Sequence, residues 1–111
     1  MTLQDSTSAQ REAHLLEHNI QQVLMQKQAL QLELNEVSNA LVELNKTKDE
    51  VFRVMGNIMM RASKESLRKE LEGKKKALEL HLALVEKQEA IIEEKLHSHH
   101  KNTVDKKISE N

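Results

Sequence analysis

The sequence lacks cysteine, proline, tryptophan and tyrosine, and Phe52 is its one aromatic residue. Without cysteine there are no disulfides, no thiolate metal ligands and no thiol nucleophile. With two glycines among 111 residues, the chain has few of the residues that mark turns. It also lacks an apolar run long enough to span a bilayer, and its first residues resemble no secretory signal. We therefore expect a small cytoplasmic protein without a deep enzyme pocket.

The charges of the chain favour neither sign. The 17 lysines and arginines nearly balance the 18 aspartates and glutamates, which gives a net charge of -1. No overall field therefore attracts nucleic acid or an anionic membrane, and we expect neither as a partner. A composition of 32% charged and 38% hydrophobic residues, rich in Ala, Glu, Lys and Leu, is typical of long helices or coiled coils.

A heptad pattern dominates the first half of the chain. Residues 1–10 show no sustained period and predict a frayed end, whereas residues 11–49 predict a helix. Apolar residues recur there at alternating steps of four and three, which is the pattern of a coiled-coil seam interrupted only by Lys27. The predicted first seam consists of Leu16, Ile20, Val23, Lys27, Leu30, Leu34, Val37, Leu41 and Leu44.

The pattern changes after this helix, where residues 50–62 predict a β-hairpin. Short apolar, partly β-branched runs flank the dipeptide Gly56-Asn57. Glycine at the first central position suits a type II′ turn, because the backbone needs a positive φ there. A two-residue loop places Met55 opposite Ile58 and Val54 opposite Met59. The apolar side chains that we expect at a subunit interface are Val51, Phe52, Val54, Met55, Ile58, Met59 and Met60.

A second helix is predicted over residues 63–98, followed by a disordered polar tail over 99–111. Ser63 is a candidate N-cap, and Glu65 suits the positive end of the helix dipole. Gly73 lies inside the helical pattern, where a loosened turn is possible. The predicted second seam consists of Leu71, Lys75, Leu78, Leu82, Val85, Glu89, Ile92 and Leu96. The expected fold is therefore all-α dominated: an antiparallel two-helix coiled coil with one β-hairpin at the helix-helix connection, in a single domain.

The hairpin is too small to be stable alone, so we expect hairpins from several chains to pair in an oligomer. The residues 51–60, together with Leu67–Leu82 and Val85–Glu89, resemble the β-type subunits of the prefoldin (GimC) family, archaeal-type; the resemblance covers about residues 15–96. It implies an ATP-independent hexameric chaperone of two α-type and four β-type subunits. Such particles bind non-native proteins and deliver them to a group II chaperonin.

The same resemblance implies that client proteins contact the distal ends of the coiled coil. The affinity of apolar patches there depends on the apolar area that they bury and not on directed hydrogen bonds, so they accept many unfolded sequences. For Ile20, Val23 and Ile92, closure of the coiled coil is an equally good interpretation. The predicted client-binding residues are Leu15, Leu16, Ile20, Val23, Leu24, Ile91, Ile92 and Leu96.

Other residue patterns give no strong functional signal. His14 and His18 share a helical face, and the histidines near residue 99 form a second group, but neither has the ligand set of a typical metal site. No nucleotide loop, catalytic motif or acid/base pair is present, so we expect no enzyme activity and no cofactor. Two alternatives stay open: a coiled-coil scaffold or tethering protein that binds one folded partner, and, more remotely, a zipper-type DNA binder.

Overall fold

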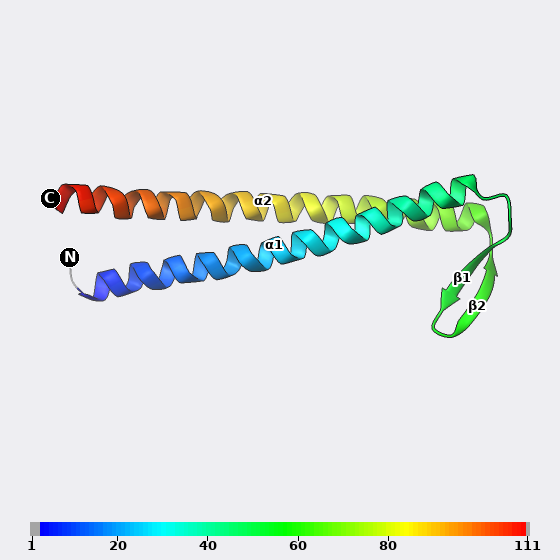
Figure 1. The fold of residues 1–111 in the computed structure, drawn as a ribbon, viewed down its shortest axis with the longest axis horizontal. Helices are drawn as coiled ribbons and strands as arrows, with labels where there is room; N and C mark the ends of the chain where they lie inside the picture. The colour runs from blue at the N-terminus through cyan, green and yellow to red at the C-terminus, as the bar shows by residue number, and fades with distance from the viewer. Residues whose placement is uncertain (1–2, 111) are drawn as a thin grey trace. The chain divides into compact units, whose positions relative to one another are not determined.

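The computed structural model describes residues 3–110, with side chains from residue 7 to residue 101. Helix α1 (Leu3–Lys46) is followed by strands β1 (Val51–Met55) and β2 (Ile58–Ala62), and then by helix α2 (Lys64–Glu110) (Figure 1). This element order confirms the predicted fold class. Neither helix contains, among the described residues, a segment long and apolar enough to cross a membrane.

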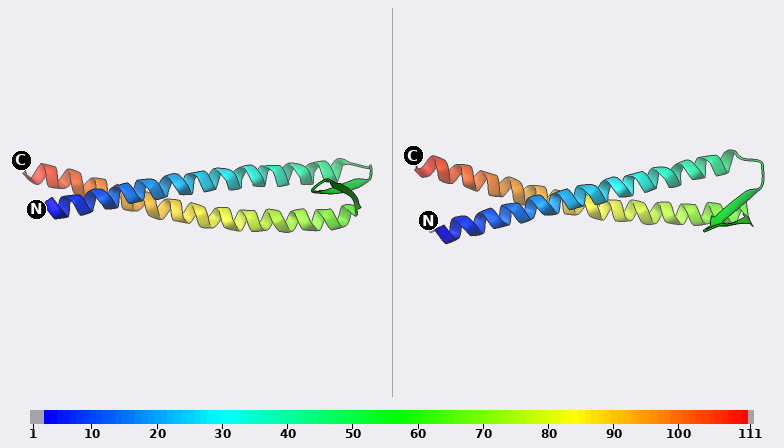
Figure 2. Two further views of the ribbon diagram at one scale, coloured as in Figure 1. Left: turned by 90° about the horizontal axis from the view of Figure 1, so that it is seen from below. Right: turned by 60° about the horizontal axis from the view of Figure 1, so that its bottom comes forward.

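The chain divides into two compact units. The terminal unit contains Met1–Gln28 and Ala83–Asn111, and the hairpin unit contains Ala29–Leu82. The chain reverses direction between α1 and α2, so each unit contains an antiparallel pair of helical segments (Figure 2).

The predicted seams form the core of both units. In the hairpin unit Leu30, Val37, Leu44 and Leu78 are buried, and in the terminal unit Val23 and Val85 are buried. Every other predicted seam residue is half-buried, including the charged ones. On α1 the buried positions recur every seven residues, as expected where one helix packs against one partner. The heptad prediction is therefore confirmed.

The hairpin has the predicted register. β1 and β2 pair antiparallel, with Met55 opposite Ile58 and Val54 opposite Met59. Gly56 has a φ of 61°, and no residue other than glycine has a positive φ in the described chain. A type I′ turn needs two positive φ values, whereas a type II′ turn needs one at its first central position. The backbone therefore agrees with the predicted type II′ turn.

Helix α2 begins with the predicted cap. The amide of Ser66 donates a hydrogen bond to Ser63 Oγ at 3.3 Å, and the amide of Leu67 donates to the Ser63 carbonyl at 3.0 Å. Glu65 lies in the first turn, where a negative charge stabilises the helix dipole. The helix continues through Gly73, so the turn there is helical.

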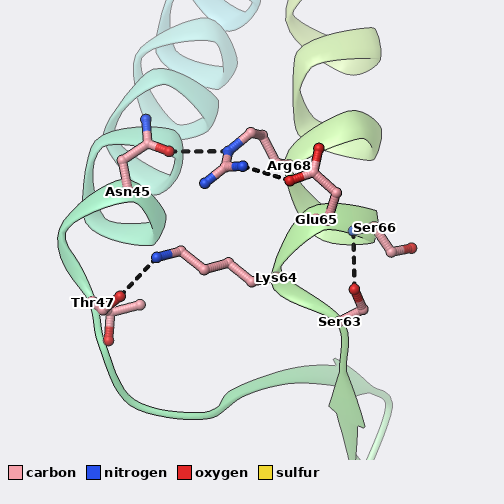
Figure 3. A network of polar contacts seen from close by, with 7 residues as sticks. All are labelled: Asn45, Thr47, Ser63, Lys64, Glu65, Ser66 and Arg68. Carbon is pink, nitrogen blue, oxygen red and sulfur yellow. Dashed lines mark hydrogen bonds and ion pairs between the residues drawn. The ribbon is translucent and has the colours of Figure 1, made fainter.

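Polar side chains join the two helix ends at the base of the hairpin (Figure 3). Lys64 Nζ donates to the carbonyl oxygen of Thr47 at 2.8 Å, just past the end of α1. Arg68 Nε donates to Asn45 Oδ1 at 3.1 Å, and its Nη1 lies 2.6 Å from Glu65 Oε2. The Lys64 bond pairs a backbone carbonyl that the end of a helix otherwise leaves to water, and the Arg68 contacts connect side chains of α1 and α2.

The helix boundaries differ from the predicted ones. The sequence predicted helix over 11–49 and 63–98, with a frayed start and a disordered tail, but α1 begins at Leu3 and α2 runs to Glu110. A heptad period reports burial against a partner, whereas the helical backbone requires only that no residue break its hydrogen bonds. Without proline, the helices extend beyond their apolar seams. Residues 1, 2 and 111, which belong to the same predicted end segments, lie outside the described residues.

The end of α1 falls three residues earlier than predicted. The amide of Asp49 donates a hydrogen bond to Thr47 Oγ1 at 3.3 Å, which is a local side-chain to backbone bond that competes with helix continuation. The last helical residue is consequently Lys46, whose charge suits the negative end of the helix dipole.

Candidate functional site

The hairpin presents an apolar surface to solvent. Val54 and Met59 are cross-strand neighbours on one face, and Met55, Ile58 and Met60 lie on the other. All five, and Phe52, are exposed, whereas Val51 is half-buried. Within the described chain the sheet has two strands, so each strand keeps one edge of backbone donors and acceptors unpaired. An exposed apolar ribbon of this kind is typical of a surface that pairs with other chains.

Two ion pairs fix charged residues around the hairpin. Arg53, on the face with Met55 and Met60, forms an ion pair with Glu70 of α2. Arg61, on the opposite face, lies 3.4 Å from Glu50 through its Nη2. The half-buried hairpin residues Val51, Arg53 and Ala62 all lie on the first face, whereas the residues on the face with Val54 and Met59 are exposed.

The eight predicted client-binding residues all lie in the terminal unit, but they differ in exposure. Leu15, Leu24 and Ile91 are exposed. Val23 is 9% exposed and closes the helix pair, so it has little surface to offer a partner. The half-buried members are Leu16, Ile20, Ile92 and Leu96.

A shallow groove on the terminal unit is lined by five of the eight predicted residues, whereas Ile20, Leu24 and Leu96 do not line it. One part, which we call the amide groove, is lined by Asn19, Gln22, Val23, Gln26, Gln88, Ile91 and Ile92. A second part, which we call the tip groove, is lined by Leu15 and Leu16 and by charged side chains such as Glu12, Glu94 and Lys95. Asn19 and Ile91 line both parts, so the two are continuous.

An ion pair lies in the seam of the terminal unit. Lys27 Nζ is 3.1 Å from Glu89 Oε2 and donates a hydrogen bond to Glu89 Oε1 at 3.3 Å. The two side chains are 26% and 17% exposed. The hydrogen bond to Glu89, together with the charge of this and nearby carboxylates, raises the pKa of Lys27 above 10.5, although partial desolvation acts in the opposite direction.

The sequence analysis identified Lys27 as the interruption of the first seam and placed Glu89 in the second seam, but it did not pair the two residues. A partial signal was present: Lys27 is the charged residue of the first seam, and Glu89, the acidic residue of the second seam, lies at a similar distance in sequence from the chain reversal. This favours a contact, because a charged seam residue in a coiled coil needs a charged partner or an exit to solvent, but the register that pairs these two residues comes from the structure. The carboxamides of the amide groove were missed altogether, since amides carry no periodic signal.

Comparison with known proteins identifies the family. Residues 8–110 match the family described as "Prefoldin subunit". The chain is 33% identical over 97 residues to the prefoldin subunit beta of Pyrobaculum calidifontis, covering 86% of this chain and 75% of that protein. It is 34% identical over 82 residues to the prefoldin subunit beta of Pyrococcus furiosus, covering 72% and 70% of the two chains.

Solved structures agree with this match. The crystal structure of the prefoldin beta subunit from Thermococcus strain KS-1 superposes with a TM-score of 0.81 at 28% identity, over 86% of each chain. The beta2 subunit from the same strain shares the fold, with a TM-score of 0.70 at 20% identity over 78% of this chain and 95% of that one. The prediction of a prefoldin-type subunit is confirmed, and the chain belongs to the prefoldin subunit family, among relatives that are archaeal β subunits.

Proposed function

We propose that the chain is a subunit of a cytoplasmic, ATP-independent chaperone, a hexamer of two α-type and four β-type subunits, and that it has no enzyme activity. In this proposal the hairpins hold the particle together, and the terminal units bind non-native proteins for delivery to a group II chaperonin. The observation that carries it is the exposed apolar hairpin with two unpaired strand edges, in a chain that matches the prefoldin subunit family over residues 8–110.

Pairing between hairpins supplies hydrogen-bond partners for the free strand edges and covers the exposed apolar side chains. Backbone groups at the free edges gain hydrogen bonds when strands of other subunits extend the sheet. Burial of an aliphatic or methionine side chain contributes about 1.5–3 kcal/mol, so covering the five exposed residues Val54, Met55, Ile58, Met59 and Met60 supports a stable assembly.

The terminal unit suits weak binding of unfolded chains. Leu15, Leu24 and Ile91 are exposed, and the tip groove carries charges of both signs, from Glu12, Glu94 and Lys95. Contacts of this type are individually weak and tolerant of sequence. Several subunits that hold one client raise the effective concentration of each further contact, so the particle retains a client and still releases it stepwise.

The test is suppression of aggregation by the complex of this chain with an α-type subunit. Replacing Leu15 and Ile91 with glutamine removes exposed apolar surface from the terminal unit, and we expect aggregation of several unrelated denatured proteins to increase. The matched control replaces Leu32 and Leu80 with glutamine and should keep full activity. These two side chains are also more than half exposed but lie in the hairpin unit. Equal loss in both variants would show that the terminal unit is not the client site.

The same assay separates the chaperone from a scaffold. A scaffold protein binds one folded partner and leaves the aggregation of unrelated denatured proteins unchanged. Activity toward only one native protein would therefore replace the proposed function with the scaffold alternative.

A further inference from the structure

The amide groove differs in composition from the rest of the surface. Charged residues make up 32% of the sequence, and the tip groove and the grooves of the hairpin unit all contain them. Among the described residues, none of those that line the amide groove is charged. They are aliphatic residues and carboxamides only, so the groove is electrostatically neutral and still rich in hydrogen-bonding groups.

The two residue types occupy different places in the groove. Val23 is buried and Ile92 is half-buried, because both belong to the seams and form the floor. Gln22 on α1 and Gln88 on α2 are exposed and border this floor from opposite helices. The groove therefore has an apolar floor, and its rims carry carboxamides from both helices together with the exposed Ile91.

This arrangement matches the chemistry of an unfolded polypeptide. A peptide group offers one donor and one acceptor, and a carboxamide offers two donors and an acceptor, so the two pair in any sequence. Aliphatic side chains of the same segment pack on the floor. A charged side chain finds no counter-charge in the groove and would lose hydration there.

We infer that the amide groove binds an extended, uncharged segment of a non-native protein, with the carboxamides of Gln22 and Gln88 hydrogen-bonded to its backbone. This inference rests on the proposed chaperone function and specifies which part of a client is recognised. A helical ligand is a poor occupant, because its backbone groups are already paired.

The length of the grooves sets the size of the segment. The amide groove follows α1 from Asn19 to Gln26, a rise of about 11 Å that about three extended residues cover, and together with the tip groove, which continues it to Glu12, the rise is about 21 Å at about 1.5 Å per residue. An extended chain covers this distance with about six residues, at about 3.3 Å per residue. The inner half of the segment meets carboxamides, and the outer half meets the charged rim of the tip groove.

The experiment compares two labelled peptides by fluorescence anisotropy with the purified full-length chain. One is an uncharged peptide of alternating leucine and serine, long enough to fill the groove. The other is identical except that esters replace two central amides, which removes two backbone donors and keeps the side chains. We expect the chain to bind the all-amide peptide more tightly, by about fivefold for each hydrogen bond lost.

The variants Gln22→Leu and Gln88→Leu, alone and together, should reduce the ratio of the affinities for the all-amide and ester peptides toward one. The matched control is Gln21→Leu, which changes an exposed glutamine on the same helix outside the groove and should keep the preference. Circular dichroism checks that all variants stay helical. The ratio of the two affinities is the readout, because leucine also raises the general affinity for apolar peptides.

Each outcome has a distinct meaning. Peptide binding without an amide preference, or a preference that survives the double substitution, would overturn the inference while leaving the chaperone function intact. Peptide binding that is unchanged by the substitutions, together with loss of self-association, would identify a second copy of the chain as the occupant and also overturn it. Failure of the chain to bind any peptide or denatured protein would overturn both the inference and the proposed function.

Discussion

Truncation of Val85 to alanine should destabilise the chain more than truncation of a larger leucine on the same helix. Val85 is 2% exposed in the seam of the terminal unit. The change removes two methyl-sized groups, about 1.6 kcal/mol at ~0.8 kcal/mol each. The cavity left by the two groups increases the loss in the free energy of unfolding by up to about 1 kcal/mol, and the better helix propensity of alanine reduces this loss by about 0.5 kcal/mol. We expect a loss of about 2 kcal/mol in the free energy of unfolding.

Leu80→Ala is the control for this prediction. Leu80 is 70% exposed on α2, so deletion of three carbon groups removes only about 0.7 kcal/mol of burial, and helix propensity returns about 0.2 kcal/mol. The expected loss is about 0.5 kcal/mol.

Urea unfolding followed by circular dichroism measures both losses. Several protein concentrations are needed, because subunit association also adds to apparent stability. Equal losses in the two variants would refute the reasoning, since they would show that the outer face of α2 is as well packed as the seam.

Three further predictions test other parts of the structure. The double substitution of Val54 and Met59 by glutamate should dissociate the oligomer and preserve helicity, because it places charges on the exposed hairpin face. An unchanged native mass in mass spectrometry contradicts this. Lys27→Met should remove the stability that the raised pKa of Lys27 implies. In a titration from neutral to alkaline pH this contribution is complete below pH 10.5 and disappears as the pH rises through the folded-state pKa, so the difference in urea midpoint between the variant and the wild type should close above pH 10.5. A difference that closes between neutral pH and pH 10.5 argues against the ion pair with Glu89 as its source. Ser63→Ala should lower the free energy of unfolding by about 1 kcal/mol through loss of the N-cap, as measured by thermal or urea unfolding. Ser63→Asp should retain most of the stability that the N-cap contributes.

The parts of the fold that follow from periodicity could be predicted from the sequence. Val23, Leu30, Val37 and Leu44 recur every seven residues, and this spacing alone predicts the buried face. Gly56 predicted the turn because a positive φ there excludes most side chains. Features of this kind depend on residues close in sequence or on a regular repeat.

The ends of the helices and the details of the candidate site could not be predicted in the same way. α2 continues to Glu110 because nothing in its backbone stops it, and a hydrophobic pattern does not report that. The pairing of Lys27 with Glu89 depends on the register of two segments far apart in sequence. The amide groove requires Gln22 and Gln88 from different helices to border one surface, which only the structure shows.

The distribution of apolar side chains links folding of this chain to its assembly. Among the described residues, six hydrophobic side chains are buried, whereas fourteen large ones are exposed, and six of the fourteen belong to the hairpin. A pair of helices buries one stripe on each helix, so the six exposed hairpin side chains gain little from the helix pair and contribute fully to stability only when other subunits cover them. The hairpin unit should therefore become more stable as protein concentration rises, whereas the seam of the terminal unit, which is complete within one chain, should respond much less. Hydrogen exchange of α1 amides at two concentrations separates these responses, because protection of residues 30–44 should rise with concentration more than protection of residues 16–27. Equal changes in both segments would show that the hairpin is not where subunits meet.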